Sequence, residues 1–151
     1  MKYESAMRAA LERARFGATA SGDVPVGAVM LNANNEIIAL GNNTRELLRD
    51  PLGHAEIVAI RAAARALGSW RLDGCTLVVT LEPCAMCAGA ILQSRIPRLV
   101  FGAWDEKAGA VGSTWDLIRD PRALHKVEVI SDVLKEECAS LLKEFFVEQR
   151  N

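Results

Sequence analysis

The spacing of hydrophobic and polar residues predicts a helix at the start of the chain and a pair of strands after it. Apolar side chains first recur every three or four residues and so share one helical face, at Tyr3, Met7, Ala10, Leu11 and Ala14. Gly17 is expected to end this helix. Two shorter apolar runs, residues 24–31 and 36–40, have no helical period, and the asparagine-rich cluster between them is typical of a turn. These two runs are therefore expected to form antiparallel strands.

From residue 41 onward, a long polar loop is followed by alternating helical and extended patterns. The loop covers residues 41–53. Helices are predicted at residues 54–67, 83–94, 115–119 and 137–146, the first of them closed by Gly68. Further strands are predicted at residues 76–81, 99–101 and 127–130. Strands that alternate with helices favour a layered α/β domain, here with a mixed sheet of five strands.

Composition places the chain among ordinary globular proteins. Half of its 151 residues are hydrophobic and a quarter are charged, which predicts a single domain over residues 1–151. No apolar run approaches the ~20 residues of a membrane span, and residues 1–4 lack a signal-peptide core, so we expect no membrane association and a cytoplasmic location. A net charge of −1 gives no global support for nucleic-acid binding, and any polyanion site must be a local basic patch.

Two short motifs supply the parts of a hydrolytic zinc site. His54 and Glu56 occur in one motif, and Cys84 and Cys87 in the other, each at the expected start of a helix. A catalytic zinc ion takes three protein ligands and leaves one position for water, so His54, Cys84 and Cys87 are the expected ligands and Glu56 is free to move protons. On a regular helix, His54 and Glu56 would point ~200° apart. They can converge only if His54 stands at the very start of its helix.

Other interpretations of these residues stay open at this point. Glu56 alone would be a favourable first-turn carboxylate, and a lone cysteine pair can be redox-active. A non-catalytic zinc module that binds RNA or protein would need a fourth ligand, for which Cys75, Cys138 and His125 are the candidates. Cys75 and Cys138 lie on apolar patterns, however, and are expected to be inert core residues.

The motifs and their surroundings resemble the zinc-dependent enzymes with the cytidine deaminase fold, and among them the bacterial tRNA-specific adenosine deaminases. The resemblance runs from Val24 to Phe146 and is carried by residues 54–57, 80–91 and the paired stretches 101–103 and 109–113. It implies a three-layer α/β/α fold with a five-stranded mixed sheet. It also implies conversion of adenosine to inosine at the wobble position of a tRNA anticodon, by a homodimer with one zinc ion per chain.

By the same resemblance, His54, Cys84 and Cys87 are the zinc ligands and Glu56 is the proton shuttle. Asn43 matches a loop asparagine that contacts the target base, and Asp105 matches an aspartate near the sugar of the preceding nucleotide; the alternatives are a turn-forming Asn and a capping Asp. The remaining substrate-binding candidates are Ala55, Leu81, Pro83 and Ala103, and Met86 is a further wall candidate. Basic side chains that can meet phosphates are Arg45, Arg49, Lys107, Arg119 and Arg122.

The chain departs from the family pattern at two places that bear on RNA binding. Leu124 stands where the family often has Asn, and residues 147–149 are less basic than in many members. A zinc deaminase of a free base or nucleoside, of the guanine or cytidine type, would use the same metal ligands. It is therefore the alternative to a tRNA enzyme.

Overall fold

The computed structural model describes residues 2–150. The helices in this range are α1 (Glu4–Ser21), α2 (Arg45–Leu48), α3 (Ala55–Leu67), α4 (Ala85–Gln93) and α5 (Lys135–Arg150). The strands are β1 (Gly27–Leu31), β2 (Ile37–Asn42), β3 (Thr76–Leu81), β4 (Arg98–Ala103) and β5 (Glu128–Ile130). Within this part of the chain, no helix is both long enough and apolar enough to cross a bilayer.

The five strands form one mixed sheet in the order β2-β1-β3-β4-β5. The second strand in this order, β1, runs antiparallel to both of its neighbours, β2 and β3. The strands β3, β4 and β5 run parallel, and α4 connects β3 to β4. The ends of β3 and β4 therefore lie at the same edge of the sheet, from which the loops after residues 81 and 103 leave.

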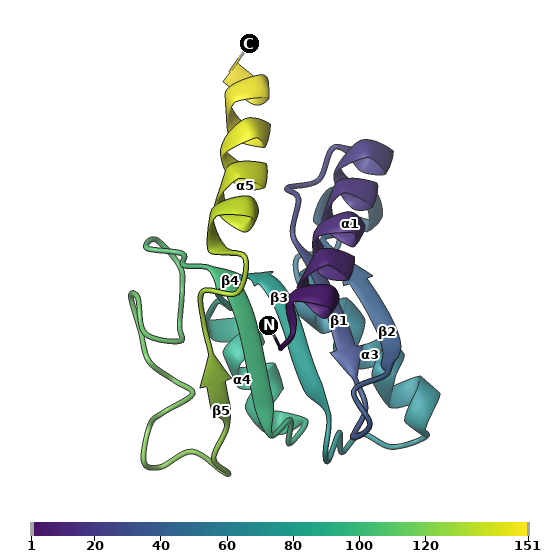
Figure 1. Cartoon of the computed structure of the whole chain (residues 1–151), viewed down its shortest axis with the longest axis vertical. Coiled ribbons are helices and arrows are strands. Elements are labelled where there is room, and N and C mark those ends of the chain that lie inside the picture. Colours follow the sequence, from purple (N-terminus) through teal and green to yellow (C-terminus); the bar gives the residue numbers. More distant parts are fainter. Residues whose placement is uncertain (1, 151) are drawn as a thin grey trace.

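Helices cover both faces of this sheet (Figure 1). α1 and α5 lie on one face, and α3 and α4 lie on the other. Alternate strand residues point to opposite sides, because side chains of a strand have a period of two. The face under α1 and α5 is formed by Val29, Leu31, Val78 and Val100. The face under α3 and α4 is formed by Ala28, Met30, Leu77, Val79, Leu99 and Phe101. The expected three-layer α/β/α architecture is confirmed.

The predicted end of the first helix is wrong. α1 continues past Gly17 to Ser21, and Gly22 ends it in the left-handed conformation, with φ of 76° and its N–H donating to the Ala18 carbonyl. Gly17 serves close packing instead, because a Cβ at this position would collide with the Asn42 side chain. The glycine thus lets α1 approach the end of β2.

Two other differences concern short elements. Residues 115–119 form no helix: Asp116 bridges Val111, and the intervening chain turns. Conversely, the predicted loop 41–53 contains the end of β2 and the four-residue helix α2, which has no buried residue and so no apolar period to reveal it. The other elements agree with prediction to within a few residues at each end, except α5, which continues to Arg150.

Candidate metal centre and substrate cavity

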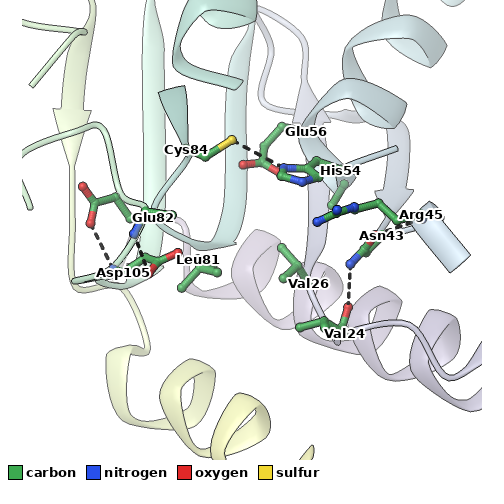
Figure 2. A pocket seen from close by; sticks show the side chains of 12 residues that line it. Val24, Val26, Asn43, Arg45, His54, Glu56, Leu81, Glu82, Cys84 and Asp105 are labelled. Atoms are coloured by element: carbon green, nitrogen blue, oxygen red, sulfur yellow. Dashed lines mark hydrogen bonds between the residues drawn. The ribbon is translucent and has the colours of Figure 1, made fainter. Parts of the chain in front are cut away.

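Two helix starts meet beyond the strand ends and bring the two motifs together. His54 immediately precedes α3, with φ −74° and ψ 151°, and Cys84 immediately precedes α4, with φ −75° and ψ 178°. Both residues therefore have extended backbone, and Cys87 lies in the first turn of α4. Because His54 is not helical, the ~200° separation of a regular helix does not apply to it. Figure 2 shows the His54 ring, the Glu56 carboxylate and the Cys84 sulfur converging.

The three expected ligand atoms have the spacing of a tetrahedral zinc site. The His54 Nδ1 atom lies 3.5 Å from Cys84 Sγ and 3.6 Å from Cys87 Sγ. A tetrahedral zinc ion with bonds of about 2.0–2.1 Å to nitrogen and about 2.3 Å to sulfur separates these donors by about 3.5 Å. All three ligand atoms lie within 4.8 Å of one another. The donor set and the two nitrogen–sulfur distances therefore fit a zinc ion.

The surroundings of the two thiols differ, and this sets which one ionises first. A hydrogen bond with Cys87 lowers the pKa of the Cys84 thiol, and a hydrogen bond with His54 lowers it further. The hydrogen bond with the Cys84 sulfur raises the pKa of Cys87, as does burial. Partial positive charge at the start of α4 favours thiolates at this end of the helix. Two thiolates and a neutral imidazole would balance the charge of one Zn²⁺ ion.

Glu56 lies beside the cluster and does not belong to it. Its side chain is 4% exposed, in the first turn of α3. Burial raises the pKa of its carboxyl group to about 7. Among residues 2–150, one group of side chains has the spacing of metal ligands, and its members are His54, Cys84 and Cys87 without Glu56. Glu56 is thus a buried carboxyl group that the metal cluster leaves free.

The candidates for a fourth protein ligand lie elsewhere. Cys75 and Cys138 are each 1% exposed and belong to the apolar cores on the two faces of the sheet, which confirms them as core residues. His125 Nε2 donates to the Ile96 carbonyl at 2.9 Å. The arrangement leaves room for a non-protein ligand, as in catalytic zinc sites.

A cavity of about 230 Å³ opens above this cluster. Its floor is formed by His54, Ala55, Glu56 and Cys84. One wall is formed by Val24, Val26, Asn43 and Arg45, and the other by Leu81, Glu82, Asp105 and Ala108. The cavity therefore joins the buried carboxyl group and the metal cluster to the two loop segments from which substrate contacts were predicted (Figure 2).

The wall that contains Asn43 is held by side-chain hydrogen bonds. Asn43 Nδ2 donates to the Val24 carbonyl at 3.3 Å, and Asn43 Oδ1 accepts the Arg45 N–H at 3.1 Å. Asp23, which is 1% exposed, accepts the N–H groups of Glu46 and Leu47 and so caps α2. Asn43 thus forms a turn and also faces the cavity.

The opposite wall contains Asp105 and also Glu82, whose role the sequence did not indicate. Asp105 caps its own turn, since its Oδ1 accepts the N–H groups of Lys107 and Ala108. The buried Glu82 side chain in turn accepts the Asp105 N–H at 3.0 Å. Glu82 was part of the recognised motif, but an acidic residue before a Pro-Cys pair carries no local signal of such a contact. Val24, Val26 and Ala108 were also missed as lining residues.

Three predicted substrate contacts, Pro83, Ala103 and Met86, do not line the cavity. Pro83 is buried, and Ala103, which is 4% exposed, packs in the core under α1 and α5. Of the basic candidates, Arg119 and Arg122 pair with Asp116 and Asp120, whereas Arg45 lines the cavity. Arg49 and Lys107 are exposed and do not line the cavity.

Comparison with known proteins agrees with this geometry. The family model for the cytidine and deoxycytidylate deaminase zinc-binding region matches residues 1–103. A tRNA-specific adenosine deaminase from Bacillus subtilis (strain 168) is 48% identical over 144 residues, which are 95% of this chain and 88% of the relative. These two matches cover both metal-binding motifs.

Solved structures show the same fold. One, from studies of A-to-I editing by tRNA deaminases at the wobble position of transfer RNA, has a TM-score of 0.87 and 43% identity, and the match covers 91% of this chain and 99% of that one. A guanine deaminase from Nitrosomonas europaea has a TM-score of 0.80 and 28% identity, with 95% of this chain and 84% of that one covered. Fold alone therefore does not separate tRNA from free-base deaminases.

The fold and the His–Cys–Cys cluster are those of a zinc-binding hydrolytic deaminase, and the chain belongs to the cytidine and deoxycytidylate deaminase family. Its resemblance to the tRNA-specific adenosine deaminases, inferred from three stretches of sequence, is confirmed by relatives that match over nearly the whole chain.

Proposed function

We propose that this chain is a single-domain enzyme that hydrolyses adenosine to inosine at the wobble position of a tRNA anticodon, with one zinc ion per chain. The observation that carries the proposal is the free, buried Glu56 carboxyl group beside three metal-ligand atoms on the floor of a cavity. The substrate class is supported by the 48% identity to a tRNA-specific adenosine deaminase.

The zinc ion would be held by His54 Nδ1, Cys84 Sγ and Cys87 Sγ. These atoms offer one nitrogen and two sulfur donors, which zinc accepts readily, and they leave one coordination position open. Zinc bound there would supply Lewis acidity that makes water a nucleophile near neutral pH. The protein's part is to fix the donor atoms at the starts of two helices and to keep the position facing the cavity open.

Glu56 would move the protons of the reaction. Its carboxylate accepts a proton from the attacking water, whose oxygen forms the new bond to C6 of the adenine. Glu56 then protonates the neighbouring ring nitrogen. It next carries the proton of the new C6 hydroxyl group to the amino group, so that the C6–N bond breaks, ammonia leaves and C6 becomes the carbonyl carbon of inosine. Such acid–base work typically contributes ~10²–10⁴ in rate. The side chain must stay unligated for this role, and it lies outside the metal cluster.

The target base would have to leave the stack of the anticodon loop to enter the cavity. We propose that Ala55 and Leu81 contact its faces and that Asn43 contacts its edge, since all three line the cavity. Asp105 would lie near the sugar of the preceding nucleotide. Pro83 and Ala103 would act from behind the lining by fixing the backbone of residues 81–84 and 103–105.

Two further features belong to the proposal. A homodimer is supported by large apolar side chains left exposed beside α3 and α4, such as Trp70 with 62% exposure. A cytoplasmic location follows from the proposed substrate, since tRNA is used there. Light scattering of the purified protein measures the mass, for which two chains are expected and one chain would contradict the dimer.

A deamination assay separates the tRNA enzyme from its alternative. The zinc-loaded protein is incubated with an anticodon stem-loop that carries adenosine at the wobble position, and in parallel with free adenosine, cytidine and guanine. We expect inosine in the stem-loop at a rate far above any change in the free compounds. A matched stem-loop with adenosine at the next position along the loop is the control and should stay unmodified. Reaction of only the free compounds would contradict the tRNA assignment.

A further inference from the structure

Glu82 is an acidic side chain enclosed by the protein and held by hydrogen-bond donors. It is 2% exposed, directly precedes the Pro83-Cys84 pair, and forms no ion pair with a basic side chain in residues 2–150. A buried carboxylate without a cation is unfavourable unless donors replace the water it has lost. The donors that surround Glu82 therefore indicate what this residue holds in place.

All of these donors come from one segment, residues 105–113. Glu82 Oε1 accepts the Asp105 N–H at 3.0 Å and also the Ser113 hydroxyl group. Glu82 Oε2 accepts the N–H groups of Val111 at 2.9 Å and of Ser113 at 3.1 Å. One carboxylate thus joins both ends of the segment, and hydrogen bonds to a charged acceptor are stronger than those between neutral groups.

The segment leaves no space beside the carboxylate. Gly109 lies against Glu82, and a Cβ at this position would collide with the Glu82 carboxylate and with the Asp105 carbonyl oxygen. Main-chain bonds add to the attachment, because Gly109 bridges Cys84 and the Ala110 N–H donates to the Pro83 carbonyl at 2.8 Å. The segment is therefore fitted closely to the backbone that carries a metal ligand.

This segment contributes Asp105 and Ala108 to the cavity wall, and Figure 2 shows Asp105 beside Glu82. The floor has anchors of its own, because His54 and Glu56 belong to the start of α3 and Cys87 to the start of α4. Cys84 is bridged to Gly109, but it is also tied to α4, since its carbonyl accepts the Ala88 N–H at 2.8 Å. Loosening residues 105–113 would therefore displace the wall while leaving the reacting groups in place. We propose that Glu82 is a positioning residue that fixes residues 105–113 as a cavity wall and so determines how well the substrate nucleotide is held. This inference rests on the proposed function.

The direct test is Glu82→Gln. The amide NH₂ group of this variant faces N–H groups whose hydrogen bonds the carboxylate accepted, and it cannot accept them. With the stem-loop as substrate, well below the unfolding temperature, we expect KM to rise about tenfold while kcat stays within about threefold. The zinc content should equal that of the parent. Glu128→Gln is the matched control, because Glu128 accepts a hydrogen bond of 2.9 Å from Arg98 Nε on the surface of the protein. This variant should keep the parent's KM.

A second pair of variants covers the case in which Glu82→Gln folds poorly. Gly109→Ala should show the same rise in KM, because its methyl group would push the segment away from Glu82. Gly89→Ala is its control, since a Cβ there meets no atom within 4 Å, and it should behave as the parent. Unchanged KM in Glu82→Gln or, should that variant not fold, in Gly109→Ala would overturn the proposal. Loss of zinc, or a fall in kcat at constant KM, would also overturn it, by placing the effect on the metal centre.

Hydrogen exchange tests the anchor without any reference to activity. In the parent, the amides of Asp105, Val111 and Ser113 should be protected, and Glu82→Gln or Gly109→Ala should accelerate their exchange while the amides of β1 stay protected. Unchanged exchange in residues 105–113 would overturn the proposal. If the parent leaves the stem-loop unmodified, the proposed function fails, and the exchange result still decides whether Glu82 holds the segment.

Discussion

Cys84 Sγ lies 3.5 Å from His54 Nδ1, although thirty residues separate the two in the sequence. The contact exists because each residue stands just before a helix on the same face of the sheet, at the edge where the parallel strands end. Together with Cys87 Sγ, which is 3.6 Å from the same nitrogen, it defines the three-atom cluster on which the proposed chemistry depends.

The first prediction concerns the ligands. Cys84→Ser should weaken zinc affinity by more than the about 10–100-fold typical of losing an outer partner of a metal ligand, and so lower the zinc content that is left after dialysis. Cys75→Ser is the matched control, because Cys75 is equally a cysteine but lies buried in the core away from the cluster. Elemental analysis of the two dialysed variants measures the effect. Full occupancy in Cys84→Ser would exclude Cys84 as a ligand.

Metal removal should expose a difference among the thiols. In the chelated protein, Cys84 should be alkylated first at pH 6, because its hydrogen bonds lower its pKa and keep it largely as thiolate. Burial raises the pKa of Cys138 to about 12, so even at pH 8 only about one in ten thousand of these thiols is ionised, and fewer still at pH 6. Mass spectrometry of labelled peptides gives the order. Labelling of Cys138 before Cys84 in the folded protein would refute this account.

The sequence predicted the long elements and the metal cluster because both leave local signals. α1 and α3 have apolar faces that repeat with the helical period, and the Cys84/Cys87 pair indicates a metal site once it is taken together with the His54 and Glu56 motif. Convergence of His54 and Glu56 requires His54 to stand at the very start of its helix, and the extended backbone at His54 meets this condition.

Features that depend on distant partners were missed. The donors to Glu82 lie 23 to 31 residues further along the chain, so nothing near residue 82 reveals them. α2 is stabilised by the Asp23 carboxylate, which precedes it by more than twenty residues. Residues 115–119 have helical composition, but the bridge from Asp116 to Val111 takes the chain in another direction.

Stability at low pH should depend on Asp132. Its pKa is lowered by hydrogen bonds from Ser131 and from Trp104, the latter 3.0 Å long. A carboxyl group whose folded-state pKa is depressed stabilises the fold above its unfolded pKa of about 3.9, and this contribution is lost as the pH falls through the folded value. Asp132→Asn should therefore be less stable than the parent at pH 7, and the difference should vanish toward pH 2. Urea unfolding across this range tests it; a difference that grows on acidification would contradict it.

The core under α3 and α4 should be sensitive to Phe101. This side chain is fully buried and makes an edge-on contact with Trp104 at 4.8 Å between ring centroids. Phe101→Ala should lower the free energy of unfolding by about 3–5 kcal/mol. Leu124→Ala, at a side chain that is 60% exposed, is the control and should change it by less than about 0.5 kcal/mol. Similar effects of the two substitutions in urea titrations would argue against the described core.

The most direct test of the central claim is Glu56→Gln, with zinc content and turnover measured on the same preparation. The variant keeps the size of a side chain that lies beside the metal cluster and outside it. We predict one zinc ion per chain in both proteins and a fall in stem-loop deamination of about 10²–10⁴-fold in the variant, whereas Glu12→Gln on the exposed face of α1 keeps the parent's rate. Parent-like turnover by zinc-loaded Glu56→Gln would contradict the proposed chemistry.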